Sequence, residues 1–176
     1  MNARLNVRSM VHLAALAVLG DIAIAPAGNA HEAGDTPTSS AATPNPAALV
    51  QLESVRHATA RFLDEQAAIA EGYVDISVFY PNMGHHYLKP ELLDEKFELA
   101  RPELLVYVDD PCGGSRRLVA IEYAVPPALA SRAPAGFVGP DDKWAINQRF
   151  QLWTLHAWLF EYNPAGVFAA YNARVH

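Results

Sequence analysis

Five short apolar segments constrain the fold of this chain more than any other feature of its sequence. Each is rich in β-branched and aromatic residues and is bounded by turn-forming residues, a pattern that predicts β-strands. The segments are VDISVFY (Val74–Tyr80), GHHYL (Gly84–Leu88), LLVYV (Leu104–Val108), RLVAIEYAV (Arg117–Val125) and FQLWTLHAWLFEY (Phe150–Tyr162). Turns at Pro81–Asn82 and in DDPCGGS join neighbouring segments as hairpins, so we predict a mainly antiparallel sheet.

A single long helix is predicted before the strands. Asn45 is a suitable N-cap, and Pro46 follows it at a position where a missing N–H costs nothing. Gly72 ends the segment, as glycine commonly does at helix C-termini. Over this segment and one residue beyond it, a mostly apolar stripe recurs at steps of three and four residues: Leu52, Val55, Thr59, Phe62, Gln66, Ile69 and Tyr73. The sequence therefore predicts an α+β fold, with one long N-terminal helix packed on the sheet in a single domain over residues 46–176.

The segment before this domain has a different character. Residues 1–30 combine Arg4 and Arg8 with an interrupted apolar run and small residues before His31, which is the pattern of a secretory signal peptide. An uncleaved membrane anchor is the alternative. Residues 31–45 contain no Phe, Tyr or Trp and are predicted to be a disordered leader. We therefore expect a periplasmic or secreted protein, with His31 at the mature N-terminus, where an amino-terminal histidine can chelate copper.

Charge and motif content exclude several functions. The net charge is −6 at pH 7 and the thirteen Lys and Arg residues are thinly spread, so we expect no nucleic acid as a partner and no membrane after signal cleavage. The sequence holds no phosphate-binding loop, dinucleotide fingerprint or Ser–His–Asp order. Cys112 is the only cysteine, so an intramolecular disulfide is impossible. We interpret it as an exposed thiol in a turn; an intermolecular disulfide or a metal ligand is the alternative.

Two ionisable residues lie in strands whose two faces are both apolar. Strand alternation gives Glu122 the neighbours Leu118, Ala120 and Ala124, with Val119, Ile121, Tyr123 and Val125 opposite, and gives His156 the neighbours Thr154, Trp158, Phe160 and Tyr162. Glu161 points to the face opposite His156, so these two residues are not expected to share a site. A buried carboxylate requires a cation, a metal or several hydrogen-bond donors.

Four ordered motifs carry a resemblance to a known group of proteins. The segments MGHHYLKPELLD, RPELLVYV, LVAIEYAVP and LHAWLFEYNPAGVFAAYNARV cover most of the chain after the leader. They resemble a family of small exported bacterial proteins with the signature M-G-x-H-Y, R-P-E-x-L-x-Y, V-x-x-E-Y and L-H-x-W-x-x-x-x-N-P-x-G, for which we know of no established activity. The resemblance places His86, Glu103, Glu122 and His156 at signature positions and His85 at a variable one.

The strand faces and the resemblance converge on His86, Glu122 and His156. Two imidazoles and one carboxylate suffice for a mononuclear divalent-metal site that leaves positions for water or a small molecule, and Zn²⁺, Fe²⁺, Mn²⁺ and Cu²⁺ all suit it. Glu103 would be a fourth ligand, an acceptor that orients a histidine N–H, or a general base. We predict that His86 faces inward and His85 outward, because adjacent strand residues point to opposite faces.

Three functions from different classes remain open. A metalloenzyme would use residues 126–142, rich in Pro and Gly, as a lid beside an open pocket. A metal- or ligand-binding protein would buffer or deliver a metal from a site sealed by side chains. A non-catalytic interaction protein would use the same His and Glu residues, with Arg101, as a structural polar network satisfied without metal. That third protein would present an exposed aromatic patch of Trp144, Trp153 and Phe137. Tyr87 and Tyr123 are interpreted as core residues.

Overall fold

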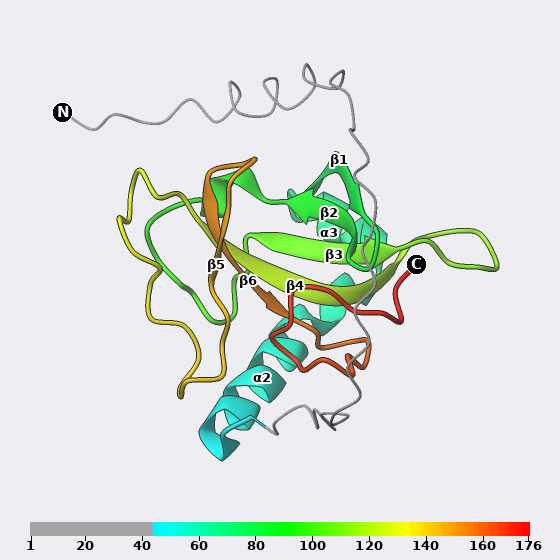
Figure 1. Cartoon of the computed structure of the whole chain (residues 1–176). Coiled ribbons are helices and arrows are strands. Elements are labelled where there is room, and N and C mark those ends of the chain that lie inside the picture. Colours follow the sequence, from blue (N-terminus) through cyan, green and yellow to red (C-terminus); the bar gives the residue numbers. More distant parts are fainter. Residues whose placement is uncertain (1–43) are drawn as a thin grey trace, which may run out of the picture. The chain divides into compact units, whose positions relative to one another are not determined.

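The predicted strand segments build one antiparallel sheet. The computed structural model describes residues 44–176; the predicted signal peptide, His31 and nearly all of the predicted leader lie outside the described residues. The strands are β1 (Val74–Tyr80), β2 (Gly84–Leu88), β3 (Leu104–Val108), β4 (Arg117–Val125), β5 (Ala145–Asn147) and β6 (Leu152–Ala157). They form a curled sheet in the order β1-β2-β3-β4-β6-β5, and each neighbouring pair is antiparallel (Figure 1).

Four strands match their predicted bounds, the last one does not, and β5 was not predicted. The prediction of a strand over residues 150–162 is wrong, because β6 ends at Ala157. The next residue, Trp158, donates its backbone N–H to the Val167 carbonyl in the C-terminal segment. β6 therefore ends where Trp158 bonds to the C-terminal segment, although Phe160 still donates its backbone N–H to the Val119 carbonyl of β4.

The helical region keeps its predicted cap but is not one long helix. It consists of α2 (Pro46–Thr59), the 3₁₀ helix η1 (Ala60–Leu63) and α3 (Glu65–Ala70). Asn45 caps α2, and its side chain accepts a hydrogen bond from the Ala47 N–H. The second break falls at Asp64, whose extended backbone and carboxylate cap α3 through the Gln66 N–H. No helix within residues 44–176 has the length and apolar character needed to cross a membrane.

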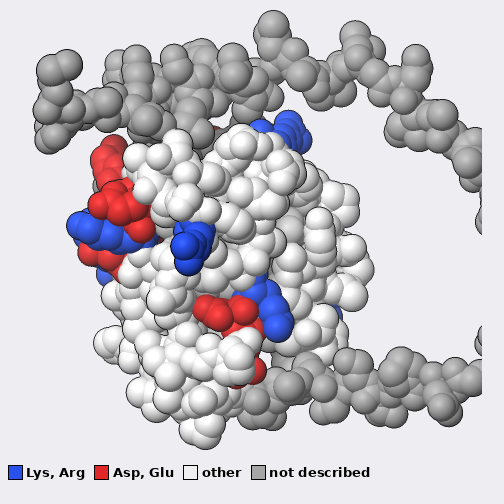
Figure 2. Space-filling model, turned by 60° about the vertical axis from the view of Figure 1, so that its left-hand side comes forward, with Lys and Arg blue, Asp and Glu red and all other residues white. Residues whose placement is uncertain are grey.

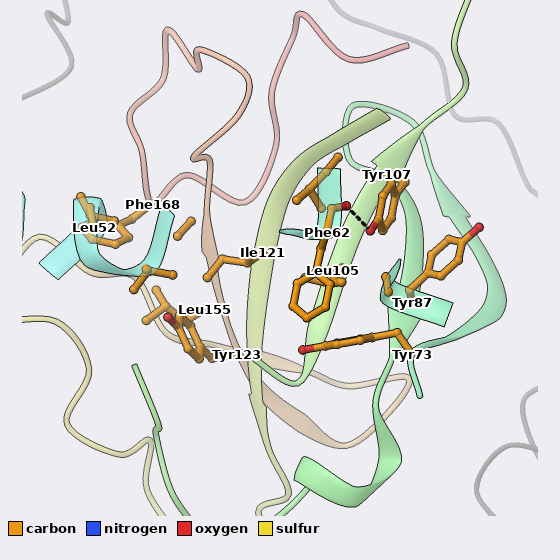
Figure 3. Close-up of a cluster of buried hydrophobic side chains, with 14 of the residues drawn as sticks. Leu52, Phe62, Tyr73, Tyr87, Leu105, Tyr107, Ile121, Tyr123, Leu155 and Phe168 are labelled. Atoms are coloured by element: carbon orange, nitrogen blue, oxygen red, sulfur yellow. Dashed lines mark hydrogen bonds between the residues drawn. The ribbon is translucent and has the colours of Figure 1, made fainter. Parts of the chain in front are cut away.

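A tertiary contact accounts for the break. Phe62 is buried in η1, and its carbonyl accepts a hydrogen bond of 2.7 Å from the Tyr107 hydroxyl of β3 (Figure 3). In a continuous α-helix that carbonyl would bond to the N–H four residues further on. The apolar stripe fits a straight helix and a broken one equally well, so it did not reveal the break.

The helices bury an aromatic-rich cluster against one face of the sheet, called here the helix side. Figure 3 labels ten of its members: Leu52, Phe62, Tyr73, Tyr87, Leu105, Tyr107, Ile121, Tyr123, Leu155 and Phe168. The prediction that Tyr87 and Tyr123 belong to the core is confirmed. Together the sheet and these short helices form an α+β fold.

A bulge in β4 changes which residues face the helices. Val106 and Tyr107 of β3 pair with Ala120 and Leu118 of β4, which leaves Val119 as an extra residue. The predicted faces of Leu118 and Val119 are therefore wrong: Leu118 packs on the helix side and Val119 packs on the other face. An inserted residue shifts the alternation by one, and beyond it Glu122 keeps its predicted face.

Charged groups on the surface are mixed rather than gathered by sign. On the face drawn in Figure 2, the Lys and Arg side chains are scattered and several lie beside Asp or Glu. Ion pairs join several of the surface charges: Arg116 pairs with Asp75 and Asp109, and Arg117 and Arg174 both pair with Glu161.

Candidate metal centre

Three buried ionisable side chains meet on the face of the sheet opposite the helices. They are His86 of β2, Glu122 of β4 and His156 of β6, with only 4%, 4% and 5% of their surfaces exposed. Glu122 and His156 are direct cross-strand partners. His86 reaches Glu122 across β3, where its own partner is Val106. The structure thus brings together the three residues predicted as metal ligands, a group called here the trio.

The spacing of the trio matches a metal site. His86 Nε2 lies 3.6 Å from Glu122 Oε2, and His156 Nε2 lies 3.5 Å from Glu122 Oε1. One ligand atom from each residue falls within 4.8 Å of the other two. Atoms bound to one tetrahedral ion at about 2.0–2.2 Å are about 3.4 Å apart. A single ion therefore fits between these atoms after small side-chain movements.

Apolar side chains enclose the trio on both sides. One cluster contains Val106, Val108, Val119, Ala120, Trp158 and Val175, and the other contains Leu88, Leu104, Ala124 and Leu152. Glu122 lies between the two because its strand neighbours Ala120 and Ala124 belong one to each, and their small side chains leave room for the imidazoles. The His156 ring also stacks on Trp158 at 6.4 Å between centroids. These contacts leave the ligand atoms with almost no exposure to solvent.

A backbone carbonyl favours one tautomer of His86 through a long hydrogen bond. Its Nδ1 lies 3.3 Å from the Val78 carbonyl of β1. A carbonyl oxygen only accepts hydrogen bonds, so Nδ1 carries the hydrogen and Nε2 of the neutral ring presents a lone pair toward Glu122. Histidine ligands of metals are commonly held in this way, with the second ring nitrogen bonded to a carbonyl or carboxylate.

His156 has a polar atom that the protein leaves unpaired. Its Nε2 is buried and finds no hydrogen-bond partner among residues 44–176. A carboxyl oxygen of Glu122 lies 3.5 Å from it, but this distance is beyond the usual hydrogen-bond range of about 2.7–3.2 Å. Nearly all buried polar groups in folded proteins are paired, so this atom is an exception that requires an explanation.

Burial drives all three groups toward their neutral forms. It lowers the pKa of His156 to about 4. It also lowers the pKa of His86, although the nearby Glu122 carboxylate opposes this shift. Burial raises the pKa of Glu122, against the opposing influence of His86 and of a hydrogen bond from Thr154. The close His–Glu contacts are therefore not ordinary salt bridges, and both imidazoles are in the neutral form that binds metals.

Comparison with known proteins does not assign this site. No family model matches the chain, and no curated protein or solved structure matches it. The role of the trio must therefore be inferred from its own geometry, and the resemblance to an exported family stays a prediction.

The two neighbouring candidates, His85 and Glu103, lie away from the trio. His85 is partly buried and contacts Asp109 and Phe79, whereas His86 faces the site, so the predicted inward orientation of His86 is confirmed. Glu103 is 2% exposed, but its carboxylate accepts the Ala124 N–H and it is not part of the ligand group. Burial raises its pKa to about 8. The structure therefore gives Glu103 no place as a fourth ligand or as a base beside the trio.

The loop predicted as a lid is anchored on the helix side. Phe137 is buried there and packs against Tyr123, Phe97 and Phe168. Residues 126–142 are thus held by the face that does not carry the trio. The predicted exposed aromatic patch is also wrong, because Phe137 is 4% exposed and both Trp144 and Trp153 are partly buried. Cys112, by contrast, is exposed as predicted.

Two contributors to the site were missed by sequence reasoning. The Val78 carbonyl is a backbone group, so the identity of the side chain does not indicate that it contacts His86. Thr154 shares the face of His156, and its contact with Glu122 follows from their adjacent cross-strand positions. Alternation had already placed Thr154 on that face, so only the pairing register of β4 and β6 was needed to predict its contact with Glu122.

Proposed function

We propose that this protein holds one divalent metal ion through His86, Glu122 and His156. The observation that carries the proposal is the unpaired Nε2 of His156, buried 3.5 Å from a carboxylate that has a second imidazole on its other oxygen. A metal ion would accept lone pairs from both imidazoles and charge from the carboxylate at once. It would thereby provide a partner for the two imidazoles and the carboxylate, which are too far apart to hydrogen-bond to one another.

A structural polar network explains the same residues less well. Such a network requires hydrogen bonds, and the two His–Glu separations are 3.5 and 3.6 Å. Arg101, the cation considered for such a network, pairs with Glu98 on the surface. Because the buried groups are not satisfied by one another, a ligand between them is the better explanation.

The enclosure of the site favours holding a metal over catalysis. A metalloenzyme keeps a coordination position open to substrate, whereas here every member of the trio is at most 5% exposed. We therefore propose storage, buffering or delivery of a metal, or structural use of it. Zn²⁺, Fe²⁺, Mn²⁺ and Cu²⁺ remain candidates, because all bind imidazole and carboxylate.

Export to the periplasm or outside the cell forms part of the same proposal. It is supported by the basic start, short apolar run and small residues of positions 1–30, and by the resemblance to exported proteins. Fractionation of cells that express the full chain, with sequencing of the mature N-terminus, tests it. Full-length protein retained in the cytoplasm would contradict this part without affecting the metal site.

Metal content provides the direct test of the site. The chain is expressed in its own compartment, purified without chelator and analysed by mass spectrometry for bound metals. We expect about one equivalent of a single metal in the wild type and a loss of most of it in His86→Ala, Glu122→Ala and His156→Ala. His85→Ala is the matched control, since it removes the adjacent imidazole on the other face. A wild type that takes up none of the four metals, even on titration, would refute the proposal.

A further inference from the structure

The strand next to His86 is irregular at the point where it meets that residue. In the β1–β2 pairing, Asp75 stands opposite Tyr87 and Phe79 stands opposite His85. Three residues of β1, numbers 76–78, therefore face the single residue His86. A regular antiparallel ladder would place one residue there, so the extra length forms a bulge.

Local interactions stabilise this bulge. Ser77 has a φ of 56°, in the left-handed region that non-glycine residues seldom adopt. The Asp75 carboxylate accepts the Ser77 N–H at 2.7 Å with one oxygen. Its other oxygen accepts a hydrogen bond from Arg116 at 2.7 Å. The Ser77 side chain is exposed, so the bulge depends on backbone conformation and on Asp75 rather than on packing of Ser77.

The bulge delivers a carbonyl to the site. Residues 76–78 are out of the ladder, and the Val78 carbonyl lies 3.3 Å from His86 Nδ1 while the Val78 side chain is buried. In regular pairing, the β1 carbonyls would bond to backbone N–H groups of β2 or point away from it. The bulge thus redirects one of them to an imidazole nitrogen.

We propose that the β1 bulge, formed by Asp75 and Ser77, is a positioning device that fixes the Nδ1–H tautomer of His86 and aims its Nε2 at the metal position. This inference rests on the proposed metal-binding function and deepens it, because it assigns Asp75 and Ser77 as positioning residues. Acceptors that orient histidine ligands typically contribute about 10- to 100-fold to metal affinity.

Protection of a sheet edge is the competing explanation. β1 is an edge strand, and bulges commonly prevent edge strands from pairing with other chains. A bulge with that role alone would change aggregation when removed and would leave the His86 ring unaffected. The tautomer of His86 therefore discriminates between the two roles.

Two matched pairs of variants in the full chain test the proposal. Ser77→Gly keeps the left-handed backbone without strain, whereas Ser77→Val opposes it with a β-branched side chain at the same exposed position. Asp75→Asn keeps the oxygen that accepts the Ser77 N–H and removes the charge, whereas Asp75→Ala removes both. The readouts are Zn²⁺ affinity by competition with a chelating dye and the ¹⁵N chemical shifts of the His86 ring in metal-free protein, assigned with His86→Ala.

The expected pattern separates this inference from the proposed function. The wild type, Ser77→Gly and Asp75→Asn should show the Nδ1–H tautomer and similar affinities, and Ser77→Val and Asp75→Ala should lose the tautomer and bind Zn²⁺ at least about 10-fold more weakly. A wild-type His86 protonated at Nε2, or Ser77→Val with unchanged affinity and tautomer, overturns the inference. Should the wild type bind no metal, the proposed function fails, and comparison of the His86 tautomer in metal-free wild type, Ser77→Val and Asp75→Ala still decides whether the bulge sets that tautomer.

Discussion

The two faces of the sheet treat their buried polar groups in opposite ways. On the helix side, buried tyrosine hydroxyls each donate to a backbone carbonyl: Tyr73 to Pro102, Tyr107 to Phe62 and Tyr123 to Leu99, at 2.6–2.7 Å. On the other face, Glu122 and two histidines face one another at 3.5–3.6 Å, and His156 Nε2 is unpaired among the described residues. Both sets of groups are buried, so the difference between them lies in hydrogen bonding. Trp144 Nε1, on a side chain that packs against the helix-side cluster, is an exception on that side, because it too has no partner among the described residues.

This difference separates groups that stabilise the fold from groups that reduce its stability. A buried polar atom without a partner costs about 1–3 kcal/mol, whereas a paired one makes a small favourable contribution. Local violations of this kind are expected at functional sites, where the rest of the structure offsets their cost. The paired tyrosines of the helix side therefore stabilise the fold, whereas the unpaired His156 of the trio lowers its stability, a cost that the proposed metal would remove.

The largest expected effect is stabilisation by metal. An ion that binds only the folded chain adds about 4 kcal/mol to the free energy of unfolding when it is present at about 1,000 times its Kd. For a domain of this size that is a rise in Tm of roughly 15 °C. Thermal denaturation of the wild type with metal and with chelator measures the rise. His156→Ala should melt at the same temperature in both conditions, while His85→Ala should respond as the wild type does.

The same thermal denaturation experiment can contradict the proposed difference between the two faces. A wild type whose Tm does not change with any of the four candidate metals would make the trio a destabilising core feature without a ligand. A response that persists in His156→Ala would place the metal elsewhere in the chain.

The next effect concerns the carboxyl group that is buried on the helix side. Burial raises the pKa of Glu103 from 4.5 to about 8, so the folded state holds its proton while the unfolded state releases it. Below pH 4.5 both states are protonated and there is no penalty. As the pH rises from about 4.5 to 7, the contribution of this residue to stability falls by on the order of 3 kcal/mol.

Glu103→Gln checks that sign. Glutamine keeps an oxygen for the Ala124 N–H and does not titrate. Denaturant unfolding in chelator at several pH values should show the variant gaining stability relative to the wild type as the pH rises from 4.5 to 7. A variant that is less stable than the wild type at pH 7 would show that Glu103 is ionised and paired in the folded state.

The strands and the trio were predictable because their signals are local. Alternation and turn residues located β1 to β4, and they identified Glu122 and His156 as ionisable groups between apolar neighbours. The breaks in regularity were not predictable in the same way. The helix ends at η1 because the Tyr107 hydroxyl takes the Phe62 carbonyl, and the β4 bulge reverses the faces of residues 118 and 119; neither follows from periodicity.

Glu103 shows a second limit of sequence reasoning. It is buried, but it precedes Leu104 and therefore shares a face with Leu105 on the helix side. Only its place in the alternation of the strand, which turns it to the helix side, separates it from the residues of the trio. The Val78 carbonyl could not be found at all, because the bulge that redirects it is centred on Ser77, an exposed residue of ordinary type.

A smaller effect tests a paired group on the helix side. Tyr107→Phe removes the hydroxyl that bonds to the Phe62 carbonyl and leaves this buried carbonyl unpaired. We expect a loss of about 1 kcal/mol in the free energy of unfolding, measured by denaturant titration, with unchanged metal affinity. A fall in metal affinity as large as that of a trio variant would show that the two faces are coupled rather than distinct.

The smallest effect on stability is expected for substitution of Glu122, although this residue is buried at the centre of the trio. Burial raises the pKa of Glu122, so in the absence of metal a neutral side chain suits its position. Glu122→Gln keeps the shape, and its amide N–H can donate to the orphaned His156 Nε2 at the place of the oxygen 3.5 Å away. Metal-free stability should therefore change by less than about 1 kcal/mol, while metal affinity should fall by at least about 100-fold because an amide is a poor substitute for carboxylate.

Denaturant titration in chelator and metal titration of the same variant measure both quantities. A metal-free Glu122→Gln protein that loses more stability than Tyr107→Phe would show that the carboxylate is ionised and pairs with the histidines in the folded state. The trio would then stabilise the fold as the tyrosines on the helix side do. A nearly unchanged metal-free stability together with lost metal binding is the result that only a ligand site predicts. In that case the carboxylate contributes to metal affinity and not to the stability of the metal-free protein.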